Sequence, residues 1–353
     1  MAVQIPTSVE TRSSAALDRA PVQAGWKTRL RRWLMRPAIP PRLGAGFRRP
    51  EGAERIVTAS LMRNYFSLPE NNFGLGADSY VATPAGGADL FHHVRDRLKA
   101  TRERVVPWLD AARPLKGARI LEIGSGSGCS SLALGEQGAA VTGLDLSEGA
   151  LTVARDRCAA YGVDAEFHCA NALDAARLFQ GEKFDFIIFF ASLEHMTHEE
   201  RLEAMSSTWE MLPRGGLWCV VEAPNRLAMF DYHTSQLPFF HWLPDDLAYK
   251  YLAKSDRPEF RGQYDQWNAE RHLDFLRRGR GVSYHEFDLA MRPAGQLDVV
   301  SALEIFHNES RLAGRLASRF TLQYETEQLL RRYGPKIHRG FYQSYLDLII
   351  RKN

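Results

Sequence analysis

The sequence predicts an α/β protein built on a doubly wound, mostly parallel sheet. Between residues 116 and 225, short apolar runs alternate with segments of helical length, which is the pattern of right-handed β-α-β crossovers. The run at 183–190 is apolar at nearly every position, as expected for a strand covered by helices on both faces. Together these two observations indicate the fold class before any motif is considered.

The elements of this region follow one another in regular order. Strands are expected at 118–123, 139–145, 165–169, 183–190 and 215–223, and helices at 129–137, 149–161 and 197–212. Thr197, with Glu200 three residues later, fits a capping box at the start of the third helix. Because ligands of such sheets bind beyond the carboxyl ends of the strands, we expect a binding site at the glycine-rich turn after the first strand.

The composition limits the class of protein. With 45% hydrophobic and 25% charged residues, the 353-residue chain can bury a sizeable core. It has no apolar run of the roughly 18 residues that a membrane span needs, and its first residues lack the order of a signal peptide. We therefore expect a cytoplasmic protein. The four cysteines form no C-x-x-C pair, which predicts buried free thiols at Cys129, Cys158, Cys169 and Cys219.

The first 55 residues differ from the rest of the chain in charge. They carry eleven Lys or Arg against four Asp or Glu, whereas the whole chain has a net charge of only +3. Within this tail, residues 26–36 place Trp and Leu at helical spacing among basic side chains. This pattern predicts a helix that lies on an anionic membrane surface or an acidic partner. A helix packed on the protein's own body, with solvated arginines, is the alternative.

Residues 56–115 are expected to form a helical region ahead of the first strand. Apolar residues recur at helical spacing from Leu90 to Leu98 and again from Val105 to Leu109. Pro107 predicts a kink in the second of these segments.

The turn "EIGSGSG" limits the cofactor. A phosphate-binding P-loop needs a G-x-x-x-x-G-K-[ST] spacing, which this sequence lacks. In a dinucleotide fingerprint the third glycine would stand where this chain has Cys129, and the glycine comes one place early at Gly128. A carboxylate at Glu122 would repel a pyrophosphate but accept hydrogen bonds from an ammonium group. The turn therefore favours a cofactor with a cationic end, without excluding NAD.

The turn also resembles motif I of the class I S-adenosylmethionine (SAM) dependent methyltransferases, and the similarity extends in order over about 115–225. The resemblance implies a Rossmann-like seven-stranded sheet with an antiparallel terminal strand, completed by strands at 296–305 and 345–352. It also implies SAM as the cofactor, with Asp145 on the ribose hydroxyls and Asn171 near the adenine. The cofactor-binding residues it implies are Glu122, Gly124, Ser125, Gly126, Gly128, Asp145, Leu146, Asn171, Ala172 and Ala191.

Two histidines are candidates for a general base, which methylation of a hydroxyl requires. His195 follows the fourth strand in "LEHM". His233 follows the fifth strand, and Asp231, two residues before it, is a candidate to orient its ring. A structural role for His195 is the alternative. Glu222, Asp231 and His233 could hold a divalent metal, but such a set is common by chance in a loop. No metal is predicted.

Substrate contacts are expected in an inserted segment, 226–295. Seven aromatic residues fall between Phe230 and Tyr251, which predicts a lid over the cleft. Asp231, Tyr232, Phe240 and Trp242 are its candidate substrate-binding residues. Ordinary core packing of an extra helical subdomain is the alternative, and both can hold at once.

The sequence therefore predicts a methyltransferase that acts on a hydroxyl of a small-molecule, glycan, lipid-linked or secondary-metabolite acceptor. A NAD-dependent oxidoreductase and a non-catalytic SAM-binding subunit are the alternatives. Nucleic acid is not expected, since the [DNS]-P-P-[YF] motif is absent after the fourth strand and the body is mildly acidic. The expected organisation is 1–55, 56–115, 116–225, 226–295 and 296–353, and the oligomeric state is left open.

Overall fold

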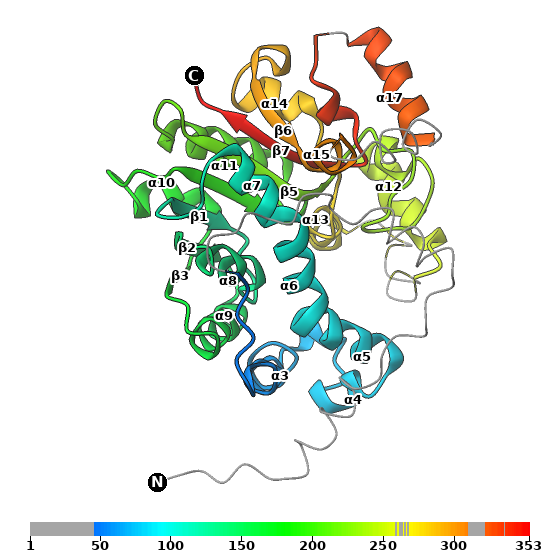
Figure 1. The fold of residues 1–353 in the computed structure, drawn as a ribbon. Helices are drawn as coiled ribbons and strands as arrows, with labels where there is room; N and C mark the ends of the chain where they lie inside the picture. Colours follow the sequence, from blue (N-terminus) through cyan, green and yellow to red (C-terminus); the bar gives the residue numbers. More distant parts are fainter. Residues whose placement is uncertain are drawn as a thin grey trace, which may run out of the picture. The chain divides into compact units, whose positions relative to one another are not determined.

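The computed structural model describes residues 46–257, 260, 264, 266, 268–309, 322–334 and 336–353. The predicted helix at 26–36, with most of the basic tail, lies outside the described residues. The chain divides into two compact units (Figure 1), and the boundary falls between Asn171 and Ala172. We call them the first unit and the second unit and describe each by itself.

The strands form a mixed sheet in the order β3-β2-β1-β4-β5-β7-β6. Their bounds are β1 (Arg119–Ile123), β2 (Ala140–Asp145), β3 (Ala165–Cys169), β4 (Phe186–Phe190), β5 (Leu217–Pro224), β6 (Asp298–Ala302) and β7 (Tyr345–Arg351). In the first unit β2 pairs in parallel with both β1 and β3. In the second unit β4 and β5 are parallel, and β7 is antiparallel to both β5 and β6. The predicted fold class is confirmed, including the antiparallel strand near the end of the chain.

The first unit surrounds β1 to β3 with helices. They are α3 (Ala53–Asn64), α4 (Ala77–Val81), α5 (Pro84–Phe91), α6 (Arg97–Ala100), α7 (Val106–Ala112), α8 (Cys129–Gly135) and α9 (Glu148–Ala160). The crossover helices α8 and α9 contact each other and the strands, and α3 lies alongside α9 (Figure 1). Gly149 permits this last approach, because a Cβ there would collide with the carbonyl oxygen of Asn64.

The long helical segment before β1 contains two wider turns. The π-helical turns His92–Asp96 and Thr101–Val105 separate α5, α6 and α7. The second turn ends immediately before α7, whose first residues include Pro107. Since proline has no N–H and its ring crowds the preceding turn, a wider turn at this position relieves the conflict. The irregularity that Pro107 predicts is therefore a π-helical turn.

The second unit contains β4 to β7 and the helices that connect them. Its helices are α10 (Ala175–Leu178), α11 (His198–Met211), α12 (Asp245–Tyr251), α13 (Ala269–Arg277), α14 (Tyr284–Ala290), α15 (Leu303–Glu309) and α17 (Leu322–Tyr333). The predicted capping box begins α11, where Thr197 and Glu200 bond to each other's backbone N–H groups. The fourth and fifth predicted strands shorten to β4 and β5 by a few residues at their starts.

The segment between β5 and β6 has a core of its own. Phe240, Tyr249, Phe260, Tyr264 and Phe275 pack together with Ala248 and Leu252. Of the seven aromatic residues between Phe230 and Tyr251, Phe240 and Tyr249 belong to this core, so both interpretations hold in part. Tyr232, Phe239, Trp242 and Tyr251 are exposed, and the first three are described with the site.

The cysteine prediction is confirmed with one correction. All four cysteines are free, but Cys169 is exposed while the other three are buried. Cys169 is the last residue of β3, a strand at the edge of the sheet, so neighbouring strands cover only one side of it. Among the described residues, no helix is both long enough and apolar enough to cross a membrane.

Candidate functional site

The glycine turn, residues 124–128, follows β1 in the first unit. Gly124, Gly126 and Gly128 have φ angles of 82°, 50° and 76°, a region that side chains with a Cβ rarely adopt. A Cβ on Gly128 would lie 2.7 Å from the Cβ of Ala154, so this glycine also lets α8 approach α9. A Cβ on Gly126 would meet nothing within 4 Å. The backbone at Gly126 is thus open to a ligand.

The ends of β2 and β3 lie beside this turn, because β1, β2 and β3 are parallel. The Asp145 carboxylate accepts hydrogen bonds from the backbone N–H groups of Gly126 at 2.8 Å and Ser147 at 2.9 Å. Leu146, the next residue, is 63% exposed despite its apolar side chain. Asn171, two residues past the end of β3, is half-buried. These residues form an edge with a carboxylate next to an exposed apolar surface.

One hydroxyl group and one carboxyl group next to the turn are buried, those of Ser125 and Glu122. The Ser125 hydroxyl has no hydrogen-bond partner among the described residues, although the residue is only 4% exposed. Glu122 is fully buried and accepts hydrogen bonds from the hydroxyls of Ser130 and Ser131, the latter at 2.5 Å. Burial raises the pKa of Glu122 to about 7, and the two hydroxyls partly oppose this shift. The sequence analysis did not identify the serines, although both stand in the first turn of the helix after the motif.

A buried arginine stabilises the glycine turn by donating hydrogen bonds to backbone carbonyl oxygens. Arg157 on α9 is 0% exposed and donates to the carbonyl oxygens of Ser127 at 2.7 Å and His93 at 3.0 Å. It thereby ties the glycine turn to the helical segment that precedes β1. The sequence analysis missed this residue because nothing in the "ARDRC" sequence separates a buried arginine from an exposed one.

In the second unit, the two predicted histidines come together around a residue that was not predicted. Nε2 of His195 and Nε2 of His233 each lie 3.7 Å from Oε1 of Glu194. The two imidazole ring centroids are 5.4 Å apart. We call Glu194, His195 and His233 the histidine cluster. The "LEHM" sequence contained Glu194, but only the fold brings His233 to it.

Hydrogen bonds to Nδ1 fix the protonation of both rings. Nδ1 of His195 lies 2.8 Å from the carbonyl oxygen of Arg277, which can only accept, so Nδ1 must carry the proton. Nδ1 of His233 lies 2.9 Å from the hydroxyl of Thr234, whose own proton goes to a carbonyl oxygen of Arg278 or Gly279. In the neutral rings both Nε2 atoms therefore have a lone pair.

Glu194 is fully buried, and neither carboxyl oxygen has a hydrogen-bond partner in the described part of the chain. Burial raises the pKa of Glu194, while His195 opposes this shift. Burial also lowers the pKa of His233 to about 4, and His195 adds to this effect. The side chains of His195 and His233 remain 45% and 26% exposed, so the cluster is open to solvent from the histidine side.

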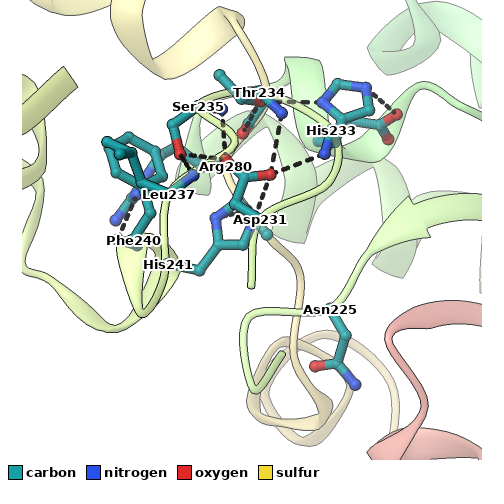
Figure 2. A network of polar contacts seen from close by, with 12 residues as sticks. Asn225, Asp231, His233, Thr234, Ser235, Leu237, Phe240, His241 and Arg280 are labelled. Carbon is teal, nitrogen blue, oxygen red and sulfur yellow. Dashed lines mark hydrogen bonds and ion pairs between the residues drawn. The ribbon is translucent and has the colours of Figure 1, made fainter. Parts of the chain in front are cut away.

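Asp231 supports the loop that carries His233 (Figure 2). Its carboxylate accepts from the backbone N–H groups of His233 and Thr234 at 2.9 Å and of Ser235 at 2.6 Å. Nε2 of His241 lies 3.2 Å from the same carboxylate. Burial alone would raise the pKa of Asp231, but His241 and the N–H donors hold it below its usual range.

These contacts correct two details of the sequence analysis. The His233 ring is oriented by Thr234 and not by Asp231, whose oxygens bind the backbone instead. The metal-capable group is Glu194, His195 and His233, not the set of Glu222, Asp231 and His233 that was considered and set aside. The reason is that the Asp231 side chain points toward its own loop, where its carboxylate binds the backbone N–H groups of the next residues.

The remaining predicted site residues have different environments. Tyr232 and Trp242 are 65% and 53% exposed, and neighbouring Phe239 is 46% exposed. Asp231 and Phe240 are buried, at 1% and 0%. Ala172 and Ala191 belong to the second unit, where Ala191 follows β4 with a φ of 44°.

The central part of the chain is similar to known proteins. A family described as "Methyltransferase domain" matches residues 120–216. A ubiquinone biosynthesis O-methyltransferase of Rhizobium leguminosarum bv. trifolii is 36% identical over 188 residues, which cover 46% of this chain and 71% of that protein. This chain belongs to the class I SAM-dependent methyltransferases. SAM is its cofactor, and the membership decides against the NAD-dependent alternative.

Two further proteins are similar to this methyltransferase over different shares of its length. A ubiquinone biosynthesis O-methyltransferase of Thiobacillus denitrificans is 34% identical over 121 residues, 34% of this chain and 50% of that protein. The methyltransferase thus spans about half the length of this relative. A solved structure, magnesium protoporphyrin IX methyltransferase from Synechocystis with bound SAM, is 24% identical and covers 49% of this chain and 77% of that one, with a TM-score of 0.35.

The first unit of the methyltransferase fits its cofactor. Gly126 leaves open space over the turn, the Ser125 hydroxyl lacks a partner, and Asp145 presents a carboxylate next to exposed Leu146. A ligand with hydroxyl groups and an apolar ring system would match this combination of a carboxylate and an apolar surface.

Proposed function

We propose that this methyltransferase transfers the methyl group of SAM to a hydroxyl oxygen of a small-molecule acceptor. The observation that carries this proposal is the pair of Nε2 lone pairs on His195 and His233, held by hydrogen bonds to Nδ1. A hydroxyl must lose its proton as its oxygen forms the new bond, and an imidazole with a fixed tautomer is suited to accept that proton. The O-methyltransferase relatives named above support the same chemistry.

The first unit holds the cofactor in this proposal. Asp145 accepts hydrogen bonds from the ribose hydroxyls, Leu146 covers the adenine, and the glycine turn lets the backbone come close. The other proposed contacts in this unit are Glu122, Gly124, Ser125, Gly126, Gly128 and Asn171. Ala172 and Ala191 belong to the second unit and stay predictions from the sequence. Bound SAM supplies a methyl group on a positively charged sulfur, which leaves as the neutral thioether while the acceptor oxygen forms the new C–O bond.

His233 is the proposed general base. Its Nε2 takes the hydroxyl proton, and Thr234 keeps the ring oriented through Nδ1. The lowered pKa of about 4 keeps this ring neutral at pH 7, although it also makes His233 a weaker base than a free imidazole. Asp231 holds the backbone of the same loop, so it supports the base without contacting the acceptor. His195 is the alternative base, since its Nδ1 donates to a carbonyl oxygen and its ring centroid lies 5.4 Å from that of His233.

The exposed aromatic side chains are the proposed acceptor contacts. Tyr232, Phe239 and Trp242 offer apolar faces, and Phe239 and Trp242 already lie with their ring centroids 5.0 Å apart. Flat ring acceptors would stack on such surfaces. A ring hydroxyl is therefore our first choice of acceptor, ahead of a glycan or a lipid-linked hydroxyl.

A matched pair of acceptors tests the proposal. The protein is incubated with SAM and either catechol or o-phenylenediamine, which share a ring but differ in having hydroxyl or amino groups. Formation of S-adenosylhomocysteine and O-methylated catechol is expected, with no product from the diamine. An N-methylated product would contradict O-methylation. If SAM binds but catechol, phenol and sugar hydroxyls all fail to give S-adenosylhomocysteine, the non-catalytic alternative gains support.

We also propose a cytoplasmic protein that contacts anionic membranes through residues 26–36. The support is the spacing of basic and apolar residues in that segment. Flotation with vesicles containing phosphatidylglycerol tests it. The full chain should float with these vesicles, whereas a variant lacking residues 1–45 should stay in the soluble fraction.

A further inference from the structure

We propose that Glu194, His195 and His233 form a binding site for a divalent transition metal of the Zn²⁺ type. One ligand atom from each residue lies within 4.8 Å of the other two. Two imidazole nitrogens and one carboxylate oxygen are a donor set that such metals prefer, while Mg²⁺ prefers oxygen ligands.

The distances suit a metal after a small contraction. Oε1 of Glu194 lies 3.7 Å from each Nε2. Two ligand atoms bound to one tetrahedral metal at about 2.1 Å are separated by roughly 3.4 Å. Metal binding would therefore require small shifts of the His195 and His233 side chains, which are 45% and 26% exposed.

The outer contacts of both histidines are those of metal ligands. A ligating histidine usually gives its second N–H to a backbone carbonyl, a carboxylate or a similar acceptor. Nδ1 of His195 donates to the carbonyl oxygen of Arg277. Nδ1 of His233 bonds to the Thr234 hydroxyl, which in turn donates to the carbonyl oxygen of Arg278 or Gly279. Both Nε2 lone pairs are therefore available without any change of tautomer.

Glu194 provides an independent argument. A fully buried carboxyl group normally has hydrogen-bond partners, because losing water without replacing it is costly. Neither oxygen of Glu194 has a side-chain hydrogen-bond partner among the described residues. The positive charge of Arg201 also acts on Glu194, but the Arg201 guanidinium donates to Glu286 and to backbone carbonyl oxygens instead. A bound cation would satisfy the carboxylate. The exposed side of the histidines leaves coordination positions for water or an acceptor oxygen.

The consequence for catalysis rests on the proposed function, but the binding itself does not. In the metal-free protein Nε2 of His233 can act as the base. With a cation held by Glu194, His195 and His233, that lone pair would be occupied. The cation would then supply Lewis-acid chemistry, lowering the pKa of an acceptor hydroxyl bound to it so that solvent could take the proton.

Metal binding is tested on the full chain without a polyhistidine tag, after chelator treatment and gel filtration. Co²⁺ is titrated and followed by its visible d–d absorption. We expect one equivalent to saturate the band, Zn²⁺ to abolish it, and excess Mg²⁺ to leave it unchanged. His195→Asn and His233→Asn should each weaken Co²⁺ binding by at least roughly tenfold, since loss of an outer contact alone can cost that much.

His198→Asn is the matched control. His198 belongs to the same unit and has a carboxylate partner, with Nε2 3.0 Å from Asp245, but lies outside the cluster. This variant should bind Co²⁺ as the wild type does. Circular dichroism and SAM affinity establish that each variant is folded. The absence of a saturable band in the wild type, or an unchanged band in a folded double variant of His195 and His233, overturns the proposal.

Methyl transfer measured in parallel separates the two proposals. Co²⁺ binding without any O-methylated product leaves the metal site standing and removes the proposed function. O-methylation at full rate in chelator-treated protein that binds no Co²⁺ would support the proposed function and remove the metal site.

Discussion

Glu122 in the first unit and Glu194 in the second are both fully buried glutamates, yet their surroundings differ. Two serine hydroxyls donate to Glu122, whereas Glu194 has no hydrogen-bond donor among the described residues and faces two imidazole nitrogens. A satisfied buried carboxyl group contributes to a rigid structure, while an unsatisfied one reduces stability unless a ligand completes it. The difference teaches that the first unit satisfies its buried glutamate with its own side chains, whereas the described residues of the second unit leave theirs without hydrogen-bond donors.

The largest expected effect comes from the histidine cluster around Glu194, the buried carboxyl group without a hydrogen-bond donor. His233→Ala should lower kcat by about 10²–10⁴-fold, because it removes the proposed base or metal ligand, while SAM affinity stays within twofold of the wild type (~0.4 kcal/mol). Turnover assays and calorimetry with SAM measure the two quantities. His198→Asn is the control and should keep its turnover. A variant at His233 with full turnover would remove this residue from the chemistry.

Stability measurements sharpen the contrast between the two carboxyl groups. Replacing Ser130 and Ser131 together by Ala leaves Glu122 without donors and should lower the free energy of unfolding by ~1–3 kcal/mol. Glu194→Gln loses no hydrogen bond and should change it by less than ~1 kcal/mol, in either direction. Urea unfolding of the chelator-treated proteins measures both. Equal losses of unfolding free energy would mean that Glu122 and Glu194 do not differ in how well their hydrogen bonds are satisfied.

The pH dependence of stability isolates Glu122. Its pKa is about 7 in the folded protein, above the ordinary 4.5, so the folded state binds more protons between these values. This contribution is fully present below pH 4.5 and is lost as the pH rises through 7. Glu122→Gln should therefore show a smaller decline in unfolding free energy from about pH 5 to 8 than the wild type. Glu103→Gln, an exposed position in the same unit, should follow the wild-type curve.

The smallest effect is expected at the exposed aromatic surface. Trp242→Ala should raise KM for a ring acceptor several-fold while changing the free energy of unfolding by no more than ~0.5 kcal/mol, since the side chain is half exposed. Steady-state kinetics with catechol and urea unfolding provide the check. Phe240 stands only two residues before Trp242 but is buried in the aromatic core. Phe240→Ala should therefore lower the free energy of unfolding by ~3–5 kcal/mol. An unchanged KM for Trp242→Ala would exclude it as an acceptor contact.

The sequence predicted most of the fold because its signals are local. Periodic apolar runs, glycines at the ends of helices and a capping box determine the type and order of the elements. The closing strands were predicted at 296–305 and 345–352, and the structure places them at Asp298–Ala302 and Tyr345–Arg351, with residues 303–305 in α15 instead. The glycine turn and Asp145 were found for the same reason, since each stands at a fixed place after a strand. Glu194 was not found, because an acidic residue beside a histidine carries no signal of its own burial.

The sequence by itself determined the alternating sheet, the cofactor turn and the two histidines as candidates. Only the tertiary structure decided that Thr234 orients His233, that Asp231 binds its own loop, and that Glu194 lies buried between two imidazole nitrogens. The physical reason is the range of the interactions. Backbone conformation follows from neighbours within a few residues, whereas burial and hydrogen-bond satisfaction depend on residues far apart in the chain, as His195 and Arg277 are.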